Sequence, residues 1–433
     1  MVEQQAIRKL QRRLLPFLML AFFVAILDRV NISIAALTMN KDLGFSNEVF
    51  GLGAGIFFLG YVLFEIPSNM IMEKVGARRW IARIMITWGV ISVLMMFVNS
   101  VPTFYALRIL LGIAEAGFYP GIIYYLTRFF PYEYRTKAFG TFQMASPIAV
   151  AIGSPISGLI LNLDGVWGLK GWQWVFLIEG LPAVILGIIC LYYLTDSPGT
   201  TKWLTDEEKD WIEGELKKEN SQKEFGHLKY GQLFSKPQFW LQILVYSCIV
   251  ISLYGVSFWL PMILKQTSGL SNVTVSFLSA VPSIVAAISI FLVARHSDKT
   301  GERKYHCLLA SLFGAIGFIV SAYVNQPYLA LAALAVAAAG IQSAIPPFWS
   351  FPAKMFTGVA AAGAIATINS IGNIGGFVGP YVVGYMSKAT GSLQSGLIFL
   401  STVLFIGAIA TFFMKIQSDH PKTKNRESAI VPE

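Results

Sequence analysis

Two related stretches of sequence decide the fold. The first is Asn69-Met-Ile-Met-Glu73-Lys-Val-Gly76-Ala-Arg78-Arg79, and the second is Ala294-Arg-His-Ser-Asp298-Lys-Thr-Gly301-Glu-Arg303-Lys304. Their acidic, glycine and two basic positions coincide at a shift of 225 residues, and Pro155 and Pro380 are separated by the same shift. A fixed shift that extends well beyond one loop indicates an internal duplication of the chain.

The composition places this duplication in a membrane. Of the 433 residues, 55% are hydrophobic and only 13% are charged, and the mean hydropathy is +0.61. A soluble domain of this length needs more charge to cover its surface, and many apolar runs reach the ~20 residues that cross a bilayer. The sequence therefore predicts an all-α membrane protein with twelve transmembrane helices in two pseudo-symmetric six-helix bundles.

The apolar runs and their polar breaks give the expected boundaries. Six spans are predicted at about 15–36, 50–72, 81–99, 103–126, 138–161 and 173–195, and six more at about 239–264, 275–296, 306–324, 327–350, 360–387 and 393–415. The resulting organisation is an N-terminal bundle (1–195), a cytoplasmic linker with a short amphipathic helix (196–238), a C-terminal bundle (239–415) and a cytoplasmic tail (416–433).

Positively charged residues are rare in every second loop and frequent in the others. If the N-terminus is cytoplasmic, the outward loops hold only Lys41, Lys170, Lys265 and Lys388, and most other Lys and Arg residues fall in inward loops and tails. This bias predicts that both termini are cytoplasmic in a multi-pass protein of the plasma membrane, here the bacterial cytoplasmic membrane. The net charge of +9 thus reflects topology, and no nucleic-acid partner is expected.

The linker contains one predicted helix. Thr205-Asp206-Glu207-Glu208 is typical of a capping box that opens a helix. Leu204, Trp211, Ile212 and Leu216 form an apolar stripe, which fits either a helix lying on the membrane surface or a solvated linker helix.

Twelve spans, duplicated halves and the repeated loop resemble the major facilitator superfamily. A narrower resemblance rests on Leu27-Asp28-Arg29-Val-Asn31-Ile, Arg108-Ile-Leu-Leu-Gly112-Ile-Ala-Glu115-Ala-Gly117-Phe-Tyr-Pro120-Gly121 and Trp349-Ser-Phe-Pro352. These stretches are similar to the anion:cation symporter family, whose members include proton-coupled carriers of sugar acids, tartrate and phthalate. The resemblance implies that the two loops are gates, with Glu73, Gly76, Arg78, Arg79, Asp298, Gly301, Arg303 and Lys304 as their residues.

The first half has charges deep inside its predicted spans, and the second half has no comparably deep charge. A charge near the bilayer centre costs ~2.5–3.5 kcal/mol even on lenient scales, so each one needs a reason. Arg29 presents a planar fork of donors that suits a carboxylate, and the family's first-span arginine is a substrate anchor. Glu115 and Asp28 are the proton-coupling candidates, with Arg108 as a partner that holds a carboxylate ionised.

Structural alternatives stay open for these residues. Arg29 can merely neutralise Asp28 or Glu115, and Arg108 can be tied permanently to Glu115, because positions 108 and 115 share a helix face. Asp28 and Arg29 are about 100° apart around their helix, so one can face the cavity while the other braces it. Glu65 and Glu179 are weaker candidates, and we expect structural roles for both.

Neutral residues complete the predicted substrate site. Tyr61 matches the family's substrate-facing tyrosine. The other candidates for substrate contact are Gln143, Tyr254, Phe258, Trp349, Asn369 and Asn373. An aromatic pair such as Tyr254 and Phe258 is more often packing, and the prolines around Trp349 predict a distorted segment that suits a gate. At the 225-residue shift, Asp28, Arg29, Arg108 and Glu115 correspond to Leu253, Tyr254, Ala333 and Gly340.

The predicted function is import of a small organic anion by proton symport and alternating access. The anion would be a carboxylate such as a sugar acid, a tartrate-like acid or an aromatic acid, and the expected partners are protons and membrane lipid, with the chain acting as a monomer. No enzyme, metal or cofactor is expected, because no nucleophile, ligand set or nucleotide loop emerges. The alternatives are a proton-coupled exporter of drugs or metabolites and, more remotely, a transport-dead anion sensor.

Overall fold

The computed structural model describes residues 2–222, 234–355 and 358–415. The predicted tail (416–433) and part of the predicted linker lie outside the described residues. The first half contains α1 (Val2–Leu43), α2 (Asn47–Val75), α3 (Ala77–Leu94), α4 (Val101–Glu115), α5 (Phe118–Thr127), α6 (Tyr132–Gln143), α7 (Ala145–Ile160) and α8 (Gly171–Tyr193). Short 3-10 turns are η1 (Met95–Phe97), η2 (Leu161–Leu163), η3 (Val166–Gly168) and η4 (Pro198–Thr200).

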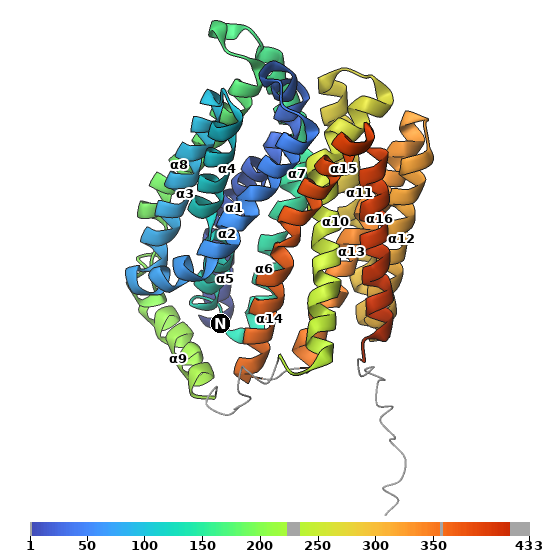
Figure 1. Cartoon of the computed structure of the whole chain (residues 1–433). Helices are drawn as coiled ribbons and strands as arrows, with labels where there is room; N and C mark the ends of the chain where they lie inside the picture. Colours follow the sequence, from blue (N-terminus) through green and yellow to red (C-terminus); the bar gives the residue numbers. More distant parts are fainter. Residues whose placement is uncertain (1, 223–233, 356–357, 416–433) are drawn as a thin grey trace, which may run out of the picture.

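The linker contains α9 (Asp206–Gln222), and the second half follows it. Its helices are α10 (Pro237–Ser268), α11 (Asn272–Thr300), α12 (Lys304–Tyr323), α13 (Pro327–Met355), α14 (Gly358–Asn373), α15 (Gly375–Thr390) and α16 (Gln394–Phe413). Figure 1 shows the first half, coloured blue to green, beside the second half, coloured yellow-green to red.

These helices make the twelve predicted spans. Eleven stretches of the described residues are long and apolar enough to cross a membrane, where α4 with α5 and α6 with α7 each count as one. The pair α14 and α15 supplies the remaining span. The predicted fold class, two six-helix bundles of membrane-spanning helices, is therefore confirmed.

Helix ends repeat at the 225-residue shift. The hydroxyl oxygen of Ser46 accepts the N–H of Val49 at the start of α2, and the hydroxyl oxygen of Ser271 does the same for Thr274 at the start of α11. The same two helices end at Gly76 and Gly301, whose φ angles are +98° and +69°. Positive φ is accessible to glycine without strain, so the repeated glycine has a backbone reason.

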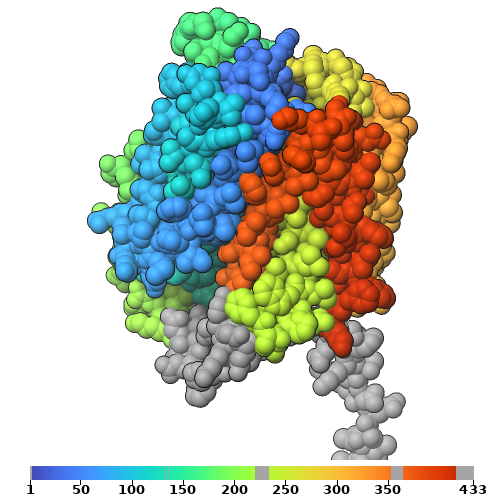
Figure 2. All heavy atoms as spheres, viewed as in Figure 1, coloured from blue at the N-terminus to red at the C-terminus, as the bar shows by residue number. Residues whose placement is uncertain are grey.

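We name the two ends of the molecule by their contents. The terminal face is the end where Val2, α9 and Phe413 lie, at the bottom of Figure 1, and the distal face is the opposite end. The two halves meet through α1 with α10, α2 with α15 and α7 with α11. In Figure 2 the blue surface of the first half lies directly against the orange-red surface of the second half towards the distal face.

Polar contacts reinforce this closure at the distal face. Asn47 Nδ2 donates to the hydroxyl oxygen of Ser387 at 2.9 Å, and the ammonium of Lys388 pairs with the carboxylate of Glu48. We call Asn47, Glu48, Ser387 and Lys388 the distal latch. All four residues lie at the ends of α2 and α15, so the latch joins one half to the other.

The first helix is longer than the predicted span 15–36, because it begins at Val2. Ala6, Leu10 and Leu14 are buried at four-residue spacing, so the basic N-terminal segment has an apolar face of its own. The ammonium of Lys9 pairs with the carboxylate of Glu208 in α9 at 2.8 Å. The segment therefore extends α1 and contacts the linker helix.

The linker helix begins at the predicted capping box. The N–H of Thr205 donates to Glu208 Oε2 at 2.9 Å, and the N–H of Glu208 donates to the Thr205 hydroxyl oxygen at 3.3 Å. Burial raises the pKa of Glu208, but Lys9 and Thr205 outweigh that effect and lower it overall. Leu204 and Ile212 are buried, and α9 contacts α1. The buried part of the apolar stripe thus faces protein and not the membrane surface, which fits the solvated linker helix better than a helix lying on the membrane.

Candidate functional site

Arg29 lies at the centre of the interface between the halves. Its Nη2 pairs with Glu115 Oε1, and its Nη1 donates to the hydroxyl oxygen of Tyr254 at 3.3 Å. The rings of Phe57 and Tyr61 lie 5.4 and 5.3 Å from the guanidinium carbon, within the range of cation–π attraction. Arg29 Nε is buried without a hydrogen-bond partner. The site therefore contains a cation with one donor still available for a ligand.

Tyr254 comes from the position that corresponds to Arg29 in the second half. The two residues are separated by 225 positions, which is the shift that relates the halves. Equivalent residues can touch one another only near the axis that relates their halves. The Arg29 to Tyr254 contact therefore places this site on the pseudo-twofold axis. A rotation of one half against the other would change the contacts of Arg29 directly.

A break in the fourth span positions Glu115. Helix α4 ends at this residue, and α5 starts after Gly117, whose φ is +86°. The carbonyl of Ala116, freed by the break, accepts the hydroxyl proton of Ser68 at 2.7 Å. A Cβ at position 117 would lie 2.4 Å from the Ser68 oxygen. The glycine in the predicted motif is thus required by both backbone conformation and space.

Arg108 contacts the backbone of α2. Its Nε donates to the carbonyl of Gly53 at 2.9 Å, and its Nη2 donates to that of Ala54 at 3.1 Å. The predicted tie between Arg108 and Glu115 is therefore wrong for this conformation, because the guanidinium turns to α2 while Glu115 pairs with Arg29. Arg108 is almost fully buried, so these carbonyls supply the hydrogen bonds that a buried cation needs.

Asp28 faces the interior of the first half. Its carboxylate accepts hydrogen bonds from Trp88 Nε1 at 2.9 Å, from the Ser92 hydroxyl at 2.8 Å and from Asn31 Nδ2 at 3.4 Å. Asp28 and Arg29 thus point to different neighbours, as their spacing on the helix predicts. Trp88 and Ser92 on α3 were not among the sequence candidates, because a Trp and a Ser in an apolar span carry no distinguishing pattern.

The remaining predicted residues fall into separate groups. The hydroxyl of Tyr119 donates to Gln143 Oε1 at 3.0 Å, and the hydroxyl of Tyr246 donates to Asn369 Oδ1 at 3.2 Å. Trp349 packs on Tyr246 with ring centroids 4.8 Å apart. Tyr119 and Tyr246 were missed by sequence reasoning, although Tyr119 lies inside the quoted fourth-span motif.

Three other candidates have less direct roles. Phe258 is fully buried and packs edge-on against Phe58 in this conformation, and its contact with substrate stays a prediction. Asn373 ends α14 and is partly exposed. The prolines around Trp349 do not interrupt α13, which is continuous to Met355, so the expected distortion does not break the helix.

The two loops of the repeated motif make different contacts. In the first loop the N–H of Arg78 donates to Asp196 Oδ1 at 2.9 Å, and Glu73 and Arg79 are exposed. In the second loop Arg303 Nη1 pairs with Asp298 at 2.5 Å, and Lys304 lies over the ring of Phe412. Each of these contacts stays inside its own half or the adjoining linker. Their role as gates remains a prediction.

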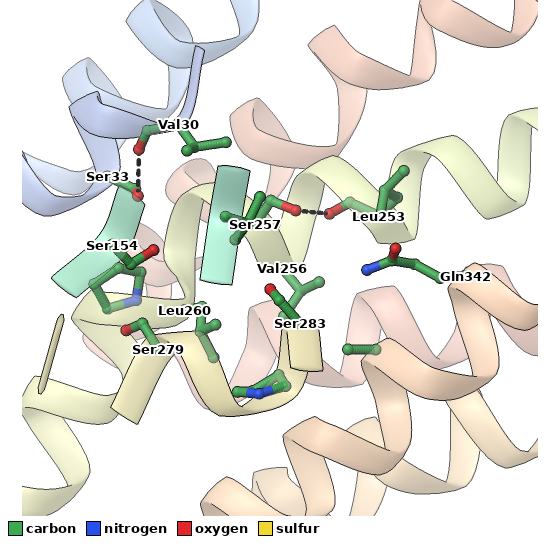
Figure 3. Close-up of a pocket in the computed structure, with 14 residues that line it drawn as sticks. Val30, Ser33, Ser154, Leu253, Val256, Ser257, Leu260, Ser279, Ser283 and Gln342 are labelled. Carbon is green, nitrogen blue, oxygen red and sulfur yellow. Dashed lines mark hydrogen bonds between the residues drawn. The ribbon is translucent and has the colours of Figure 1, made fainter. Parts of the chain in front are cut away.

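A small cavity lies between the halves and is lined by Val30 of α1 and Leu253 of α10 (Figure 3). Its volume is about 40 Å³, near that of one water molecule. Its polar lining is made by Ser33, Ser154, Ser257, Ser279, Ser283 and Gln342. The hydroxyls of Ser33 and Ser257 donate to carbonyls of their own helices. The cavity is too small for an organic acid in this conformation.

No cluster of three or more metal-binding side chains occurs within residues 2–222, 234–355 and 358–415. Cys190, Cys248 and Cys307 are buried free thiols. The chemistry available at the centre of the molecule is therefore that of Arg29, the neighbouring carboxyl groups and neutral hydrogen-bonding side chains.

The sequence is similar to those of known membrane transporters. The family model described as Major Facilitator Superfamily matches residues 18–380. A protein of Agrobacterium vitis named "Putative tartrate transporter" is 48% identical over 99% of this chain and 95% of its own. The "Quinolone resistance transporter" of Acinetobacter baumannii is 40% identical over 98% of both chains.

A solved structure shares the fold. The inward-facing, occupied structure of a bacterial homologue of the human lysosomal transporter Spinster superposes with a TM-score of 0.77. The match covers 92% of this chain and 96% of that one, at 18% sequence identity. The two bundles, the matched residues and the full-length relatives agree, and this chain belongs to the Major Facilitator Superfamily of membrane transporters.

Proposed function

We propose that this protein carries a small carboxylate together with protons by alternating access. The observation that carries the proposal is the buried pair of Arg29 and Glu115 on the axis between the halves. Arg29 Nε has no partner, and a guanidinium with an available donor suits a carboxylate ligand held by two parallel hydrogen bonds.

Competition for Arg29 links the anion to the proton. In the structure Glu115 occupies part of the guanidinium that a substrate carboxylate would use. Protonation of Glu115 removes its charge and releases Arg29 for the substrate, and bound substrate in turn makes a neutral Glu115 more favourable. By linkage each ligand raises the affinity for the other, which is the condition for symport.

Alternating access follows from where the halves touch. The distal latch and the packing of α2 on α15 close the distal face. Rocking of the halves about the Arg29 site would break the latch and open that face. The charge bias of the loops makes the terminal face cytoplasmic, so the distal face would admit substrate from outside.

Energetics favour proton coupling for import. An anion that enters a negatively charged cell opposes the membrane voltage by ~2.3 kcal/mol per charge per 100 mV. One or more accompanying protons offset this cost. The tartrate relative supports a hydroxylated carboxylate as substrate, and the amides of Gln143 and Asn369 suit hydroxyl groups. We expect the carrier to function as a monomer in the bacterial cytoplasmic membrane.

Export is the second candidate, because one full-length relative is named for quinolone resistance. An exporter would share the fold and would use the proton gradient in the opposite sense. Arg29 favours an anionic substrate in either direction. The direction of the pH gradient that produces uphill movement separates the two functions.

The test uses purified protein in proteoliposomes with a panel of radiolabelled carboxylates and a cationic dye. We expect uphill uptake of one or more carboxylates when the side facing substrate is acidic, and loss of this uptake in Arg29→Ala. Glu115→Gln should retain exchange at equal concentrations but lose pH-driven accumulation. Glu133→Gln, which alters an exposed carboxylate, is the matched control. Uphill uptake that persists in Glu115→Gln would exclude the assigned coupling site.

A further inference from the structure

A second carboxyl group is buried in the first half, away from Arg29. Glu179 lies on α8 and is only 2% exposed. Its Oε1 is 2.7 Å from the hydroxyl oxygen of Ser157 on α7, and its Oε2 has no hydrogen-bond partner. A buried ionised carboxylate with an unpaired oxygen is costly, so the protonation state of Glu179 needs an explanation.

The hydrogen bonds of Ser157 indicate the protonation state of Glu179. The Ser157 oxygen lies 2.7 Å from Glu179 Oε1 and also 3.0 Å from the carbonyl oxygen of Gly153. Both neighbours are acceptors if Glu179 is ionised, and a serine has one hydrogen to donate. A proton on Glu179 Oε1 resolves the conflict, because Glu179 then donates to Ser157 while Ser157 donates to Gly153. With a neutral Glu179 the hydroxyl hydrogens of Glu179 and Ser157 each have an acceptor, whereas an ionised Glu179 leaves two acceptors competing for one hydrogen.

The charged and polar groups around Glu179 also favour its neutral form. The charged group that interacts with Glu179 is Asp28 on α1, and Asn31 on the same helix interacts with both carboxyl groups. Helix α7 presents Ser157, while α3 presents Trp88 and Ser92 to Asp28. Among the described residues, no cation pairs with either carboxyl group. Two ionised carboxylates here would repel each other without compensation.

Asp28 differs from Glu179 in its hydrogen bonds. It accepts from three donors, Trp88, Ser92 and Asn31, an arrangement that favours the ionised form. The ionised form is therefore assigned to Asp28, whose charge is stabilised by donors from α1 and α3, and the neutral form to Glu179.

We propose that Glu179 forms a second proton-binding site inside the first half, separate from the Arg29 and Glu115 site. In the conformation closed at the distal face, Glu179 carries the proton. Its part in transport rests on the proposed proton symport, whereas its protonation does not. Release breaks the O–H bond of Glu179 and passes the proton to water, leaving Glu179 ionised. The transport cycle then moves one proton at each site.

Infrared spectroscopy tests the protonation without any transport assay. A neutral carboxyl group has a carbonyl stretch separate from that of a carboxylate. We expect such a band at neutral pH in the wild type, its loss in Glu179→Gln and its retention in Glu115→Gln. Ser157→Ala, which removes the acceptor of the Glu179 proton, should shift the band to higher frequency. An unchanged band in both Glu179→Gln and Ser157→Ala would overturn the proposal.

Stability and stoichiometry give two further measurements. Gln mimics a neutral Glu, so Glu179→Gln should unfold within a few degrees of the wild type at pH 7. A large loss of stability would instead indicate an ionised, structural Glu179 and would overturn the proposal. The number of protons carried with each substrate should fall by one in Glu179→Gln. Absence of carboxylate transport would refute the proposed function and leave the infrared result intact.

Discussion

The two halves of the molecule share a scaffold and differ in chemistry. Their equivalent turns at Gly44 and Gly269 both have positive φ, +67° and +63°, and their second helices begin with the same serine cap. The first half nevertheless holds Asp28, Arg29, Arg108 and Glu115 in its interior, together with the buried Glu65 and Glu179. At the positions equivalent to the first four, the second half has Leu253, Tyr254, Ala333 and Gly340. Duplication preserved the backbone while the ionisable groups stayed in one copy.

One pair of equivalent residues meets between the two halves. Arg29 and Tyr254 contact each other on the axis, so a cation from one half faces a neutral hydroxyl from the other. A ligand held at this point contacts both halves. Binding can therefore influence their relative orientation, while the proposed proton sites lie in the first half.

The largest expected effect comes from removing the charge on the axis. Arg29→Ala should lower kcat/KM for the transported carboxylate by about 100-fold or more, because it removes the anchor and leaves Glu115 as an unpaired buried charge. Initial uptake rates in proteoliposomes measure this. Arg29→Lys keeps the positive charge but loses the planar fork of donors, so its kcat/KM should lie between those of the wild type and Arg29→Ala. Equal rates in wild type and Arg29→Ala would show that the asymmetry of charge is irrelevant to transport.

The next test compares equivalent positions 115 and 340. A Cβ at Gly340 would lie 2.4 Å from the backbone nitrogen of Gly314 and 2.5 Å from the carbonyl oxygen of Ala310. Gly340→Ala should therefore destabilise the protein by ~1–3 kcal/mol through overpacking, seen as a lower Tm in a thermal-unfolding assay. Gly140→Ala is the matched control, since a Cβ there meets open space. An unaltered Tm in Gly340→Ala would show that position 340, the equivalent of Glu115, does not require a glycine for close helix packing.

A smaller effect is expected from the second half's contribution to the axis. Tyr254→Phe removes the hydroxyl that accepts from Arg29, a contact worth ~0.5–1.5 kcal/mol. We expect KM to change by about threefold to tenfold with kcat nearly retained, measured from the concentration dependence of uptake. Tyr61→Phe keeps the ring over Arg29 and should change KM less. A larger effect at Tyr61 than at Tyr254 would place the substrate wholly in the first half.

The smallest effect concerns the distal latch. Lys388→Ala removes an exposed ion pair with Glu48, and exposed pairs contribute little. The population open at the distal face should rise by a factor of about two or less, measured as faster labelling of a cysteine introduced at Phe50, which is buried against Trp259 of the second half. Lys265→Ala is the control, because Lys265 donates to Leu270 in its own half. Slower labelling in Lys388→Ala would show that Lys388 does not hold this face closed.

Local sequence patterns predicted much of this molecule. Apolar run lengths gave the twelve spans, and the shift between the two loop motifs gave the duplication. The capping box at Thr205 formed as expected. The opposed directions of Asp28 and Arg29 followed from helix geometry alone. These features depend on residues close together in the chain, so a single sequence contains the information.

Contacts between helices were harder to predict. The sequence showed that Arg108 and Glu115 share a face, but the partner of Arg108 is the backbone of α2, and small residues there let it approach. The docking of α9 on α1 and the contact of Glu179 with Ser157 also join segments far apart in sequence.

By itself, the sequence determined the membrane class, the two related halves and the set of ionisable residues buried in the first half, because hydropathy, repeat length and charge are properties of the chain. Only the tertiary structure decided which of these residues meet. In the folded chain Arg29 contacts Tyr254 and Glu115, and Glu179 contacts a serine whose single hydroxyl hydrogen has another acceptor. The physical reason is that a buried charge must find its partners among whatever groups the neighbouring helices present.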